Sequence, residues 1–464
     1  MDIKITPSSL SGAVEIPASK SCAHRSLICA AIADGVSVLS GVTMSKDIEA
    51  TISAVTALGA SVEVNGDIVT VKGISSPSAK ADIDCNESGS TLRFIIPVAA
   101  ALGAESTFFG RGRLPERPID IYVRELGKNG IKFDYANTMP FSISGRLSGG
   151  TYEIEGNVSS QFITGLLFAL PLLDGDSEIV LTSHLESRPY VDITIDTLRR
   201  FGVSVEESAN GFKIRGGQKY KPHDEKIEGD YSQAAFFFVA NALGSDINVH
   251  NLDDSSVQGD KRILDIIVGM SHSGGLGSYR ADCSDIPDLV PILAVLGTFG
   301  SERSVIYNAQ RLRIKESDRL VSTAAMLNAL GGNVEVTDDG LIIDPVGSLH
   351  GGTVDGAGDH RIVMAAAIAA TRADGEVIIK GAQAASKSYP DFFKNLSEEE
   401  ILTGKAADAY ARLTSSIIAS ARARAAQDKM TENAKKILDL RITWRGEFRI
   451  SAMQQKRILC LHRA

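Results

Sequence analysis

Short polar segments followed by long apolar runs recur along the chain. They read SKSCAHRSLICAAIA from Ser19, SGSTLRFIIPVAAAL from Ser88, SSQFITGLLFALPLL from Ser159, YSQAAFFFVANAL from Tyr231, IPDLVPILAVLGTFG from Ile286 and DHRIVMAAAIAA from Asp359. None of these runs has the polar stripe of a surface helix, so each predicts a helix enclosed by other elements. A turn with Gly and a β-rich run, such as DGVSVLSGV, follow most of them and predict a strand.

Most of these segments are followed by an amphipathic helix and a hairpin. DIEATISAVTALGASVEVNGDIVTVKG from Asp47 is one example. The starts of the six apolar helices lie between 55 and 73 residues apart. The pattern therefore predicts a unit of about 70 residues repeated six times, with the fourth unit shortened around SHSGGLGS.

The first turns of these helices carry hydroxyl, carboxylate and cationic side chains. Ser, Asp and Asn at helix starts are capping residues, and the exposed N–H groups of several helix starts in one cleft would bind anions. Lys20, Arg25, Arg93 and Arg361 would add full positive charges. Structural ion pairs are the alternative for each of them alone, but their recurrence at equivalent places in a repeat favours an anion site.

Composition and charge narrow the class of protein. The chain has 464 residues, 44% of them hydrophobic, which is enough for two or three domains. A net charge of -9 disfavours binding to nucleic acid or to anionic membranes. The sequence has no apolar leader and no run long enough to span a membrane, so we expect a cytoplasmic protein. Five scattered cysteines without a paired motif predict neither disulfides nor a zinc site.

An ordered series of motifs links the repeats. They are SKSCAHR, SGSTLRF, LPERPI, NVSSQFITGLL, ESRPYVDIT, DIPD, RIKESDRL, GAGDHRIVMA and ASKSYPDFF. From Met1 to about Leu396 the chain resembles the enolpyruvyl transferase family and, within it, the 5-enolpyruvylshikimate-3-phosphate synthases. The resemblance implies an α/β (α+β) fold with two lobes, three βαβαββ repeats in each, and an active site in the cleft between them.

The resemblance also implies where the chain passes between the lobes. The crossings are expected near Pro17 to Lys20 and near Lys226 to Gly229. Residues 1–18 together with 229–397 would form the first, discontinuous lobe, and residues 19–228 the second. Residues 398–464 would be a helical or disordered extension outside the family pattern.

The activity implied by the resemblance explains the need for cations. It is transfer of the enolpyruvyl group of phosphoenolpyruvate to the 5-hydroxyl of shikimate-3-phosphate, with release of phosphate through a tetrahedral intermediate, in the shikimate pathway of aromatic amino-acid biosynthesis. Two phosphates and two carboxylates meet in one site, and arginine forks suit both groups. Proton transfer needs a carboxylate base and a nearby acid. We expect no metal or organic cofactor, no nucleic-acid or membrane partner, and a monomer.

The resemblance assigns binding positions residue by residue. The shikimate-3-phosphate positions are Lys20, Ser21, Arg25, Ser159, Ser160, Gln161, Ser187, Tyr190, Asp288 and Lys315. The phosphoenolpyruvate positions are Lys20, Gly89, Arg117, Gln161, Arg319, Arg361 and Lys387. Helix capping is the alternative for Ser159, Ser160 and Ser187, and a solvated loop lysine is the alternative for Lys387.

Three residues match the family's proton-transfer groups. Asp288 matches the base for the 5-hydroxyl, Glu316 matches a proton-transfer residue, and Lys20 is expected to reach the transferred proton. IPD before an apolar helix is also typical of a helix cap, with Asp285 as a competitor, but we favour the catalytic interpretation. His360 is expected to be satisfied by hydrogen bonds.

Asp318 and Asp359 are expected to orient neighbouring cations. Three positions depart from the family pattern, and one of them is Ser90, which stands where many relatives have Thr. Glu87 stands where many relatives have Asn, which puts an added carboxylate beside phosphoenolpyruvate, and Arg311 stands where relatives often have Asn.

Two other functions compete with this interpretation. An enolpyruvyl transferase acting on UDP-N-acetylglucosamine typically has a Cys acid in the loop before RP, but the loop GRGRLPERPI has none and places Gly112 there. A noncatalytic repeat protein that binds a phosphorylated metabolite would have no use for two carboxylates in the cleft. The first interpretation is therefore favoured over both.

The family pattern ends before the chain does. Residues 401–464 are rich in Ala, Arg and Lys, which favours helix, and contain the single Trp, Trp444. They could form an auxiliary appendage, a partner-binding tail or an extension without function. A catalytic module is the least expected, because every matched position lies before Lys394.

Overall fold

The computed structural model describes residues 1–272 and 275–398. The predicted extension therefore lies outside the described residues from position 399 onward, and its expected helical or disordered character stays a prediction.

Six apolar helices lie at the centres of the repeats, as the sequence predicts. They are α1 (Lys20–Ile32), α3 (Gly89–Leu102), α5 (Ser160–Ala169), α7 (Tyr231–Ala242), α9 (Val290–Thr298) and α11 (His360–Ala370). All residues of α9 and α11 are buried. These helices are enclosed on every side because they have no polar face to present to water.

A second helix follows in each repeat and covers one face only. These helices are α2 (Lys46–Ala57), α4 (Asp120–Lys128), α6 (Arg188–Arg200), α8 (Ile263–Met270), α10 (Arg319–Ala329) and α12 (Phe392–Glu398). In α4 the buried residues are Ile121, Tyr122, Glu125 and Leu126, which share one side of the helix. The amphipathic pattern therefore predicts the burial correctly.

Four sheets of four strands share one order, with a parallel first pair followed by antiparallel strands. Three are β6 (Lys80–Asp84), β7 (Glu105–Phe109), β9 (Phe141–Gly145), β8 (Ile131–Asp134); β10 (Thr151–Ile154), β11 (Ser177–Leu181), β13 (Gly211–Ile214), β12 (Glu206–Ser208); and β18 (Arg280–Asp282), β19 (Ser304–Tyr307), β21 (Leu341–Asp344), β20 (Asn333–Val336). The fourth is β14 (Glu225–Lys226), β3 (Val36–Ser40), β5 (Ile68–Lys72), β4 (Ser61–Asn65).

The first and fourth repeats exchange their first strands. β2 (Ser11–Glu15) precedes α1 but pairs in parallel with β15 (Asp246–His250), which follows α7. β14 precedes α7 but pairs in parallel with β3, which follows α1. The two connecting segments meet at a bridge between Ala18 and Gly229, where the Ser19 N–H donates to the Glu228 carbonyl at 2.7 Å.

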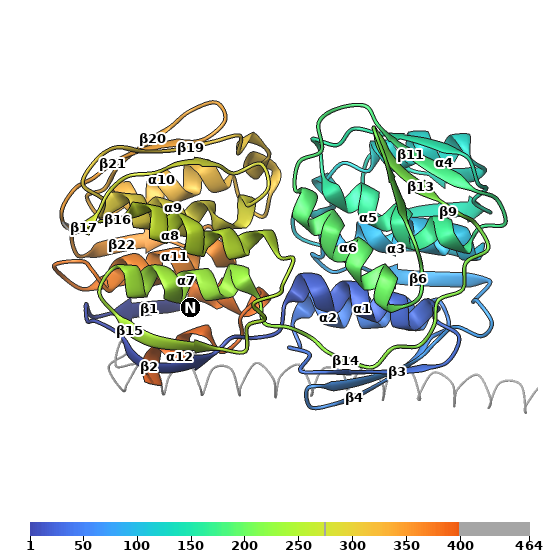
Figure 1. The fold of residues 1–464 in the computed structure, drawn as a ribbon, viewed down its shortest axis with the longest axis horizontal. Helices are drawn as coiled ribbons and strands as arrows, with labels where there is room; N and C mark the ends of the chain where they lie inside the picture. The colour runs from blue at the N-terminus through green and yellow to red at the C-terminus, as the bar shows by residue number, and fades with distance from the viewer. Residues whose placement is uncertain (273–274, 399–464) are drawn as a thin grey trace, which may run out of the picture. The chain divides into compact units, whose positions relative to one another are not determined.

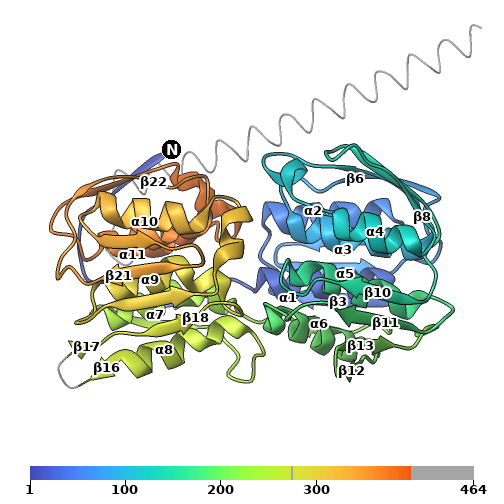
Figure 2. The same cartoon turned by 90° about the horizontal axis from the view of Figure 1, so that it is seen from above.

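The sixth repeat is completed from the start of the chain. β1 (Asp2–Ile5) pairs antiparallel with β23 (Val377–Lys380), and β22 (Gly352–Asp355) pairs in parallel with β23. The fourth repeat has only a short hairpin of β16 (Ser271–His272) and β17 (Gly275–Leu276), in agreement with the predicted shortening. Figures 1 and 2 show α1 to α6 gathered in one group and α7 to α11 in another.

Apolar side chains fill the space around the central helices. One continuous core runs from Ala18 to Ile227 and includes an edge-to-face contact of Phe94 with Phe168 at 5.7 Å between ring centroids. The four cysteines of the described residues are free and buried. Within the described ranges, none of the helices has the length and apolar character required to cross a membrane.

Candidate active site

Several buried helices begin at one pocket, and their first residues are held there by caps. The side chains of Ser88, Ser159 and Asp359 accept hydrogen bonds from backbone N–H groups of α3, α5 and α11. Ser19 accepts from the Cys22 N–H at the start of α1. Because the caps satisfy only part of each first turn, the remaining N–H groups and side chains face the pocket.

Fifteen of the sixteen predicted site residues line this pocket. They are Lys20, Ser21, Arg25, Gly89, Arg117, Ser159, Ser160, Gln161, Ser187, Tyr190, Asp288, Lys315, Glu316, Arg319 and Arg361. The other one, Lys387, lies beside the pocket, where its Nζ is 3.0 Å from Glu87 Oε2 and 3.1 Å from the Gly358 carbonyl. The residues come from both groups of repeats, so the pocket requires both.

Lys20 is paired with a carboxylate that the sequence did not single out. Its Nζ is 2.8 Å from Asp47 Oδ2. Burial alone would lower the pKa of Lys20, but Asp47 and Glu316 outweigh burial and raise it. Asp47 lies in the first turn of α2, where an acidic residue is ordinary for a helix start. That ordinary position explains why sequence reasoning missed it.

Arg25 is buried among neutral acceptors. Its guanidinium donates to Thr194 Oγ1 at 2.8 Å and to the carbonyls of Ser21 and Tyr190 at 2.7 and 2.8 Å. Burial lowers the pKa of Arg25 to about 10, which still leaves it charged at neutral pH. The charge is therefore available to an anion in the pocket.

Arg93 and Arg117 lie close together near the starts of α3 and α5. Arg93 donates to Gln161 Oε1 at 2.8 Å, and burial, aided by Arg117, lowers its pKa to about 10. A Cβ atom at Gly89 would lie 2.5 Å from a terminal nitrogen of Arg117, so a residue with a side chain would push that arginine aside. Gln161 also donates to Ser90 Oγ at 3.0 Å. Sequence reasoning noted Arg93 only as a first-turn cation.

Asp288 forms the centre of the opposite wall. Its Oδ1 is 2.7 Å from a terminal nitrogen of Arg319, its Oδ2 is 3.3 Å from Arg361, and the Tyr190 hydroxyl donates to Oδ2 at 3.2 Å. Burial would raise the pKa of Asp288, but Arg361 and Arg319 outweigh burial and hold it well below its usual range. The carboxylate is therefore ionised in the structure.

The helix-cap alternative for Asp288 is wrong. Asp288 lies inside the 3-10 turn η4 (Pro287–Leu289), which precedes α9, and its carboxylate oxygens contact side chains of other elements. The competitor Asp285 accepts from the Arg188 N–H at 3.0 Å and so holds the start of α6 instead. Asp288 is free of any capping role.

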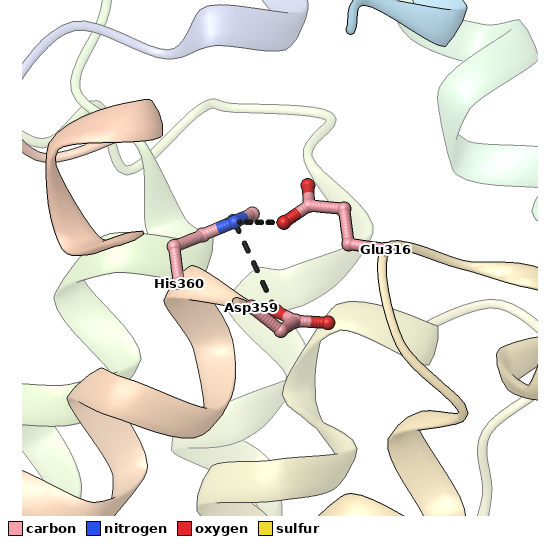
Figure 3. A group of neighbouring side chains, drawn as sticks. All are labelled: Glu316, Asp359 and His360. Carbon is pink, nitrogen blue, oxygen red and sulfur yellow. Dashed lines mark hydrogen bonds and ion pairs between the residues drawn. The ribbon is translucent and has the colours of Figure 1, made fainter. Parts of the chain in front are cut away.

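Glu316, His360 and Asp359 lie close together, with His360 Nδ1 3.9 Å from Asp359 Oδ1 (Figure 3). His360 Nδ1 is 3.0 Å from Glu316 Oε2, which confirms that this histidine is satisfied by a hydrogen bond. Burial would raise the pKa of Glu316, but His360 outweighs it and holds the pKa well below its usual range.

The spacing of these three groups would suit a cation, with all three ligand atoms within 4.8 Å of one another. However, Asp359 Oδ2 already accepts from Arg319 Nε at 2.8 Å and from Ser317 Oγ at 3.1 Å, and Oδ1 accepts from the Arg361 N–H. The carboxylate of Asp359 therefore orients Arg319, as expected. Both of its oxygens already accept hydrogen bonds and are not free to bind a cation.

Lys315 supplies a second ammonium whose proton is easily lost. Burial lowers its pKa to about 8, with Arg319 and Arg311 acting in the same direction and Asp288 opposing them. A lysine with this pKa can exchange a proton near neutral pH.

Two of the residues that depart from the family pattern, Arg311 and Glu87, have charged partners. Arg311 is buried, and its Nε lies 3.3 Å from Glu186 Oε2. Glu87 lines the pocket but turns its carboxylate to Lys387.

Ser187, next to Glu186, has a positive φ of 56° and donates from its N–H to the Ser284 carbonyl at 2.9 Å.

Comparisons with known proteins agree with this geometry. A family model described as EPSP synthase (3-phosphoshikimate 1-carboxyvinyltransferase) matches residues 5–396. The 3-phosphoshikimate 1-carboxyvinyltransferase of Clostridium novyi (strain NT) is 44% identical over 421 residues, covering 86% of this chain and 97% of the relative. That of Clostridium beijerinckii (strain ATCC 51743 / NCIMB 8052) is 45% identical over 422 residues, covering 85% and 97%.

Two solved structures share the fold. EPSP synthase from Acinetobacter baumannii has a TM-score of 0.74 at 24% identity, covering 86% of this chain and 98% of that chain. The enolpyruvyl transferase NikO from Streptomyces tendae has a TM-score of 0.69 at 18% identity, covering 86% and 97%. The predicted α/β fold of repeated βαβ units is therefore confirmed. By sequence, fold and matched length, this chain belongs to the EPSP synthase (3-phosphoshikimate 1-carboxyvinyltransferase) family.

Proposed function

We propose that this pocket transfers the enolpyruvyl group of phosphoenolpyruvate to the 5-hydroxyl of shikimate-3-phosphate and releases phosphate. The supporting observation is the position of Asp288, an ionised carboxylate held by two arginines in a pocket otherwise rich in cations. Anion binding alone does not require a carboxylate there, because it would repel the ligand. A general base for a substrate hydroxyl does require one.

Shikimate-3-phosphate is assigned to the wall formed by residues 19–228. Ser159, Ser160 and Gln161 open α5 at the pocket, where hydroxyl, amide and backbone N–H groups suit a phosphate. Arg25, on α1, has no carboxylate partner, so its positive charge is available to the carboxylate of the substrate. Tyr190 and Ser187 flank the ring, with Lys315 and Asp288 on the opposite wall.

Phosphoenolpyruvate is assigned to Arg117 on the wall formed by residues 19–228 and to Arg319 and Arg361 on the opposite wall. The buried Nε of Arg117 has no hydrogen-bond partner among the described residues, whereas Arg319 and Arg361 are paired with Asp288. When the anionic groups of phosphoenolpyruvate bind these arginines, they weaken the hold on Asp288 and raise its pKa. The carboxylate then becomes a better acceptor for the proton of the 5-hydroxyl.

The proton balance follows from this arrangement. The 5-hydroxyl oxygen attacks C2 of phosphoenolpyruvate and its proton passes to Asp288. The Lys20 ammonium supplies a proton to C3, giving the tetrahedral intermediate, and the ionised Glu316 can accept the proton that C3 later loses. Loss of that proton from C3 and departure of phosphate complete the transfer. Lys20 is suited to this exchange because Asp47 and Glu316 both act on its ammonium.

The rival acceptor is UDP-N-acetylglucosamine. The loop before Arg117 carries Gly112 at the place of the rival's Cys acid, and Gly112 has a positive φ of 57° with Glu87 Cδ 2.9 Å from the position of an added Cβ. A cysteine there would be strained and would displace Glu87. This observation favours shikimate-3-phosphate.

A phosphate-release assay tests the proposal. The purified chain is given phosphoenolpyruvate with shikimate-3-phosphate, with UDP-N-acetylglucosamine, or alone. We expect phosphate only with the first pair. Release with UDP-N-acetylglucosamine alone among the acceptors would favour the rival, and binding of both substrates without release would favour a noncatalytic protein. The cytoplasmic location and the monomeric state stay predictions.

A further inference from the structure

A second buried carboxyl group lies behind the site. Asp260 belongs to the 3-10 turn η3 (Gly259–Arg262), which leads into α8, and it is only 4% exposed. It does not line the pocket. The turn packs against the start of α6, since a Cβ at Gly259 would lie 2.7 Å from the Pro189 side chain. Tyr190 is therefore held between Asp260 and the pocket.

The Tyr190 hydroxyl connects the two carboxyl groups. Its oxygen lies 3.4 Å from Asp260 Oδ2 and 3.2 Å from Asp288 Oδ2. The Ser232 hydroxyl also donates to Asp260 Oδ2. The other oxygen, Oδ1, is buried and has no hydrogen-bond partner among the described residues. An ionised carboxylate with one unpaired buried oxygen is costly. The charged and neutral forms of Asp260 are therefore close in free energy.

The groups that face Asp260 come from five elements. They are Asp230 and Ser232 at the start of α7, Tyr190 on α6, Asp288 on η4, Arg361 on α11, and Cys283 after β18. Burial and the charge of Asp288 raise the pKa of Asp260 to about 7, against the opposing effects of the Ser232 hydrogen bond and Arg361. Asp288 is held ionised by its two arginines, so the proton shared by the two carboxyl groups resides on Asp260.

We propose that Asp260 is a positioning residue for the transfer, whose negative charge, acting directly and through the Tyr190 hydroxyl, makes Asp288 a stronger base for the substrate hydroxyl. The proposal rests on the proposed function, in which Asp288 accepts the proton of the 5-hydroxyl. Asp260 does not touch the substrate. It acts by setting how strongly Asp288 attracts a proton.

The physical reason is the repulsion between like charges at short range. When Asp260 loses its proton, its negative charge disfavours a second negative charge on Asp288, so Asp288 accepts a proton more readily. When Asp260 is protonated, this effect is absent. The benefit to the reaction therefore appears as the pH rises through the pKa of Asp260, and below that pH an uncharged replacement should perform almost as well.

The test is the pH profile of turnover for Asp260→Asn and the wild type. We expect the ratio of wild-type to variant turnover to approach one near pH 5.5 and to rise to about three- to tenfold above pH 8, as Brønsted behaviour implies for a weakened base. Asp265→Asn, on the exposed face of α8, is the matched control and should give a ratio of one throughout. A ratio that does not change with pH would mean a structural role and would overturn the proposal.

A second variant keeps the test decisive if Asp260→Asn does not fold. Ser232→Ala removes the hydrogen bond that stabilises the charged form of Asp260, so the rise in turnover should move to higher pH. Infrared titration of the wild type should also show a carboxylic acid that loses its proton near pH 7. An unmoved profile in Ser232→Ala, or no such titration, would contradict the proposal. If the wild type releases no phosphate at any pH, the proposed function fails instead.

Discussion

The two walls of the pocket hold their charges in different ways. On the wall built by residues 19–228, Arg25 and Arg93 donate only to neutral oxygens, and burial lowers the pKa of each to about 10. On the wall built by residues 229–398, Arg319 and Arg361 are paired with carboxylates. Burial would lower the pKa of both, but Asp359 and Asp288 outweigh it for Arg319, and Asp288 and Asp230 outweigh it for Arg361, so both are raised.

This difference separates two tasks. Unpaired buried cations are costly in the free protein, and the binding of an anion relieves that cost. Paired cations and carboxylates are already stable, and a ligand that binds the cations releases the carboxylates for proton transfer. The unpaired arginines of the first wall are therefore suited to hold the anionic substrate, and the paired groups of the second wall, together with the Lys20–Asp47 pair, to move protons.

The largest expected effect is on stability. Arg319→Gln leaves the buried Asp359 and the half-buried Asp288 with one partner fewer, so the free energy of unfolding should fall by about 3–5 kcal/mol. Arg117→Gln, the matched change on the first wall, leaves no carboxylate without its contact and should change it by less than about 1 kcal/mol. Urea unfolding measures both. Equal losses would contradict the contrast between the walls.

The next largest effect is expected on the pH dependence of folding stability. His24, on α1, is buried, and burial lowers its pKa from 6.5 to about 3. The unfolded chain binds this proton below pH 6.5 and the folded chain does not, so stability is lost as pH falls from 6.5 toward 3, by up to about 1.4 kcal/mol per pH unit. His24→Gln should remove that part of the slope. His350→Gln, at an exposed position, serves as the control, and an unchanged slope in His24→Gln would refute the prediction.

A smaller effect is expected where the walls meet through Glu87 and Lys387. Glu87→Gln frees Lys387 and removes a negative charge from the pocket edge, so the KM for phosphoenolpyruvate should fall by about two- to fivefold, the range of an exposed ion pair. Glu105→Gln, which breaks the exposed pair with Lys80, is the control and should leave KM unchanged. A rise in KM for Glu87→Gln would show that Glu87 assists binding.

The smallest effect should follow removal of the extension. Ending the chain after Glu400 keeps the six repeats and every pocket residue, so at least about half of the phosphate-release activity should remain. Activity and thermal unfolding of the shortened chain measure this. A loss beyond about tenfold in a folded protein would show that the extension acts on the pocket.

Local patterns predict the helices of this fold well. The run RIVMAAAIAA after Asp359 is apolar on all sides and therefore predicts a buried helix with an N-terminal cap, as found in α11. The exchange of β2 and β14 between two repeats depends on pairing between segments 235 and 186 residues apart. Nothing in the residues of either strand specifies that pairing, and the family resemblance implied only that the chain crosses near Pro17 to Lys20 and near Lys226 to Gly229.

The residues of the site also divide into those that the sequence identifies and those that only the folded structure brings together. Family motifs identify Lys20 and Asp288, because each lies in a matched segment. Their partners are a different matter: Asp47 occupies an ordinary helix start, and Asp260 lies in an unremarked turn. A partner across the fold has no sequence signal of its own, because its role depends on burial and on the charge that it faces.

The division of tasks between the walls is tested most directly by one paired measurement, in which shikimate-3-phosphate binding by calorimetry and turnover by phosphate release are determined for Asp288→Asn and Arg25→Gln. The account predicts that Asp288→Asn binds within several-fold of the wild type but turns over about a hundredfold or more slowly. It predicts that Arg25→Gln binds at least about tenfold more weakly, since a charge-assisted contact is lost. Equal losses of binding in the two variants, or unchanged turnover in a folded Asp288→Asn, would contradict it.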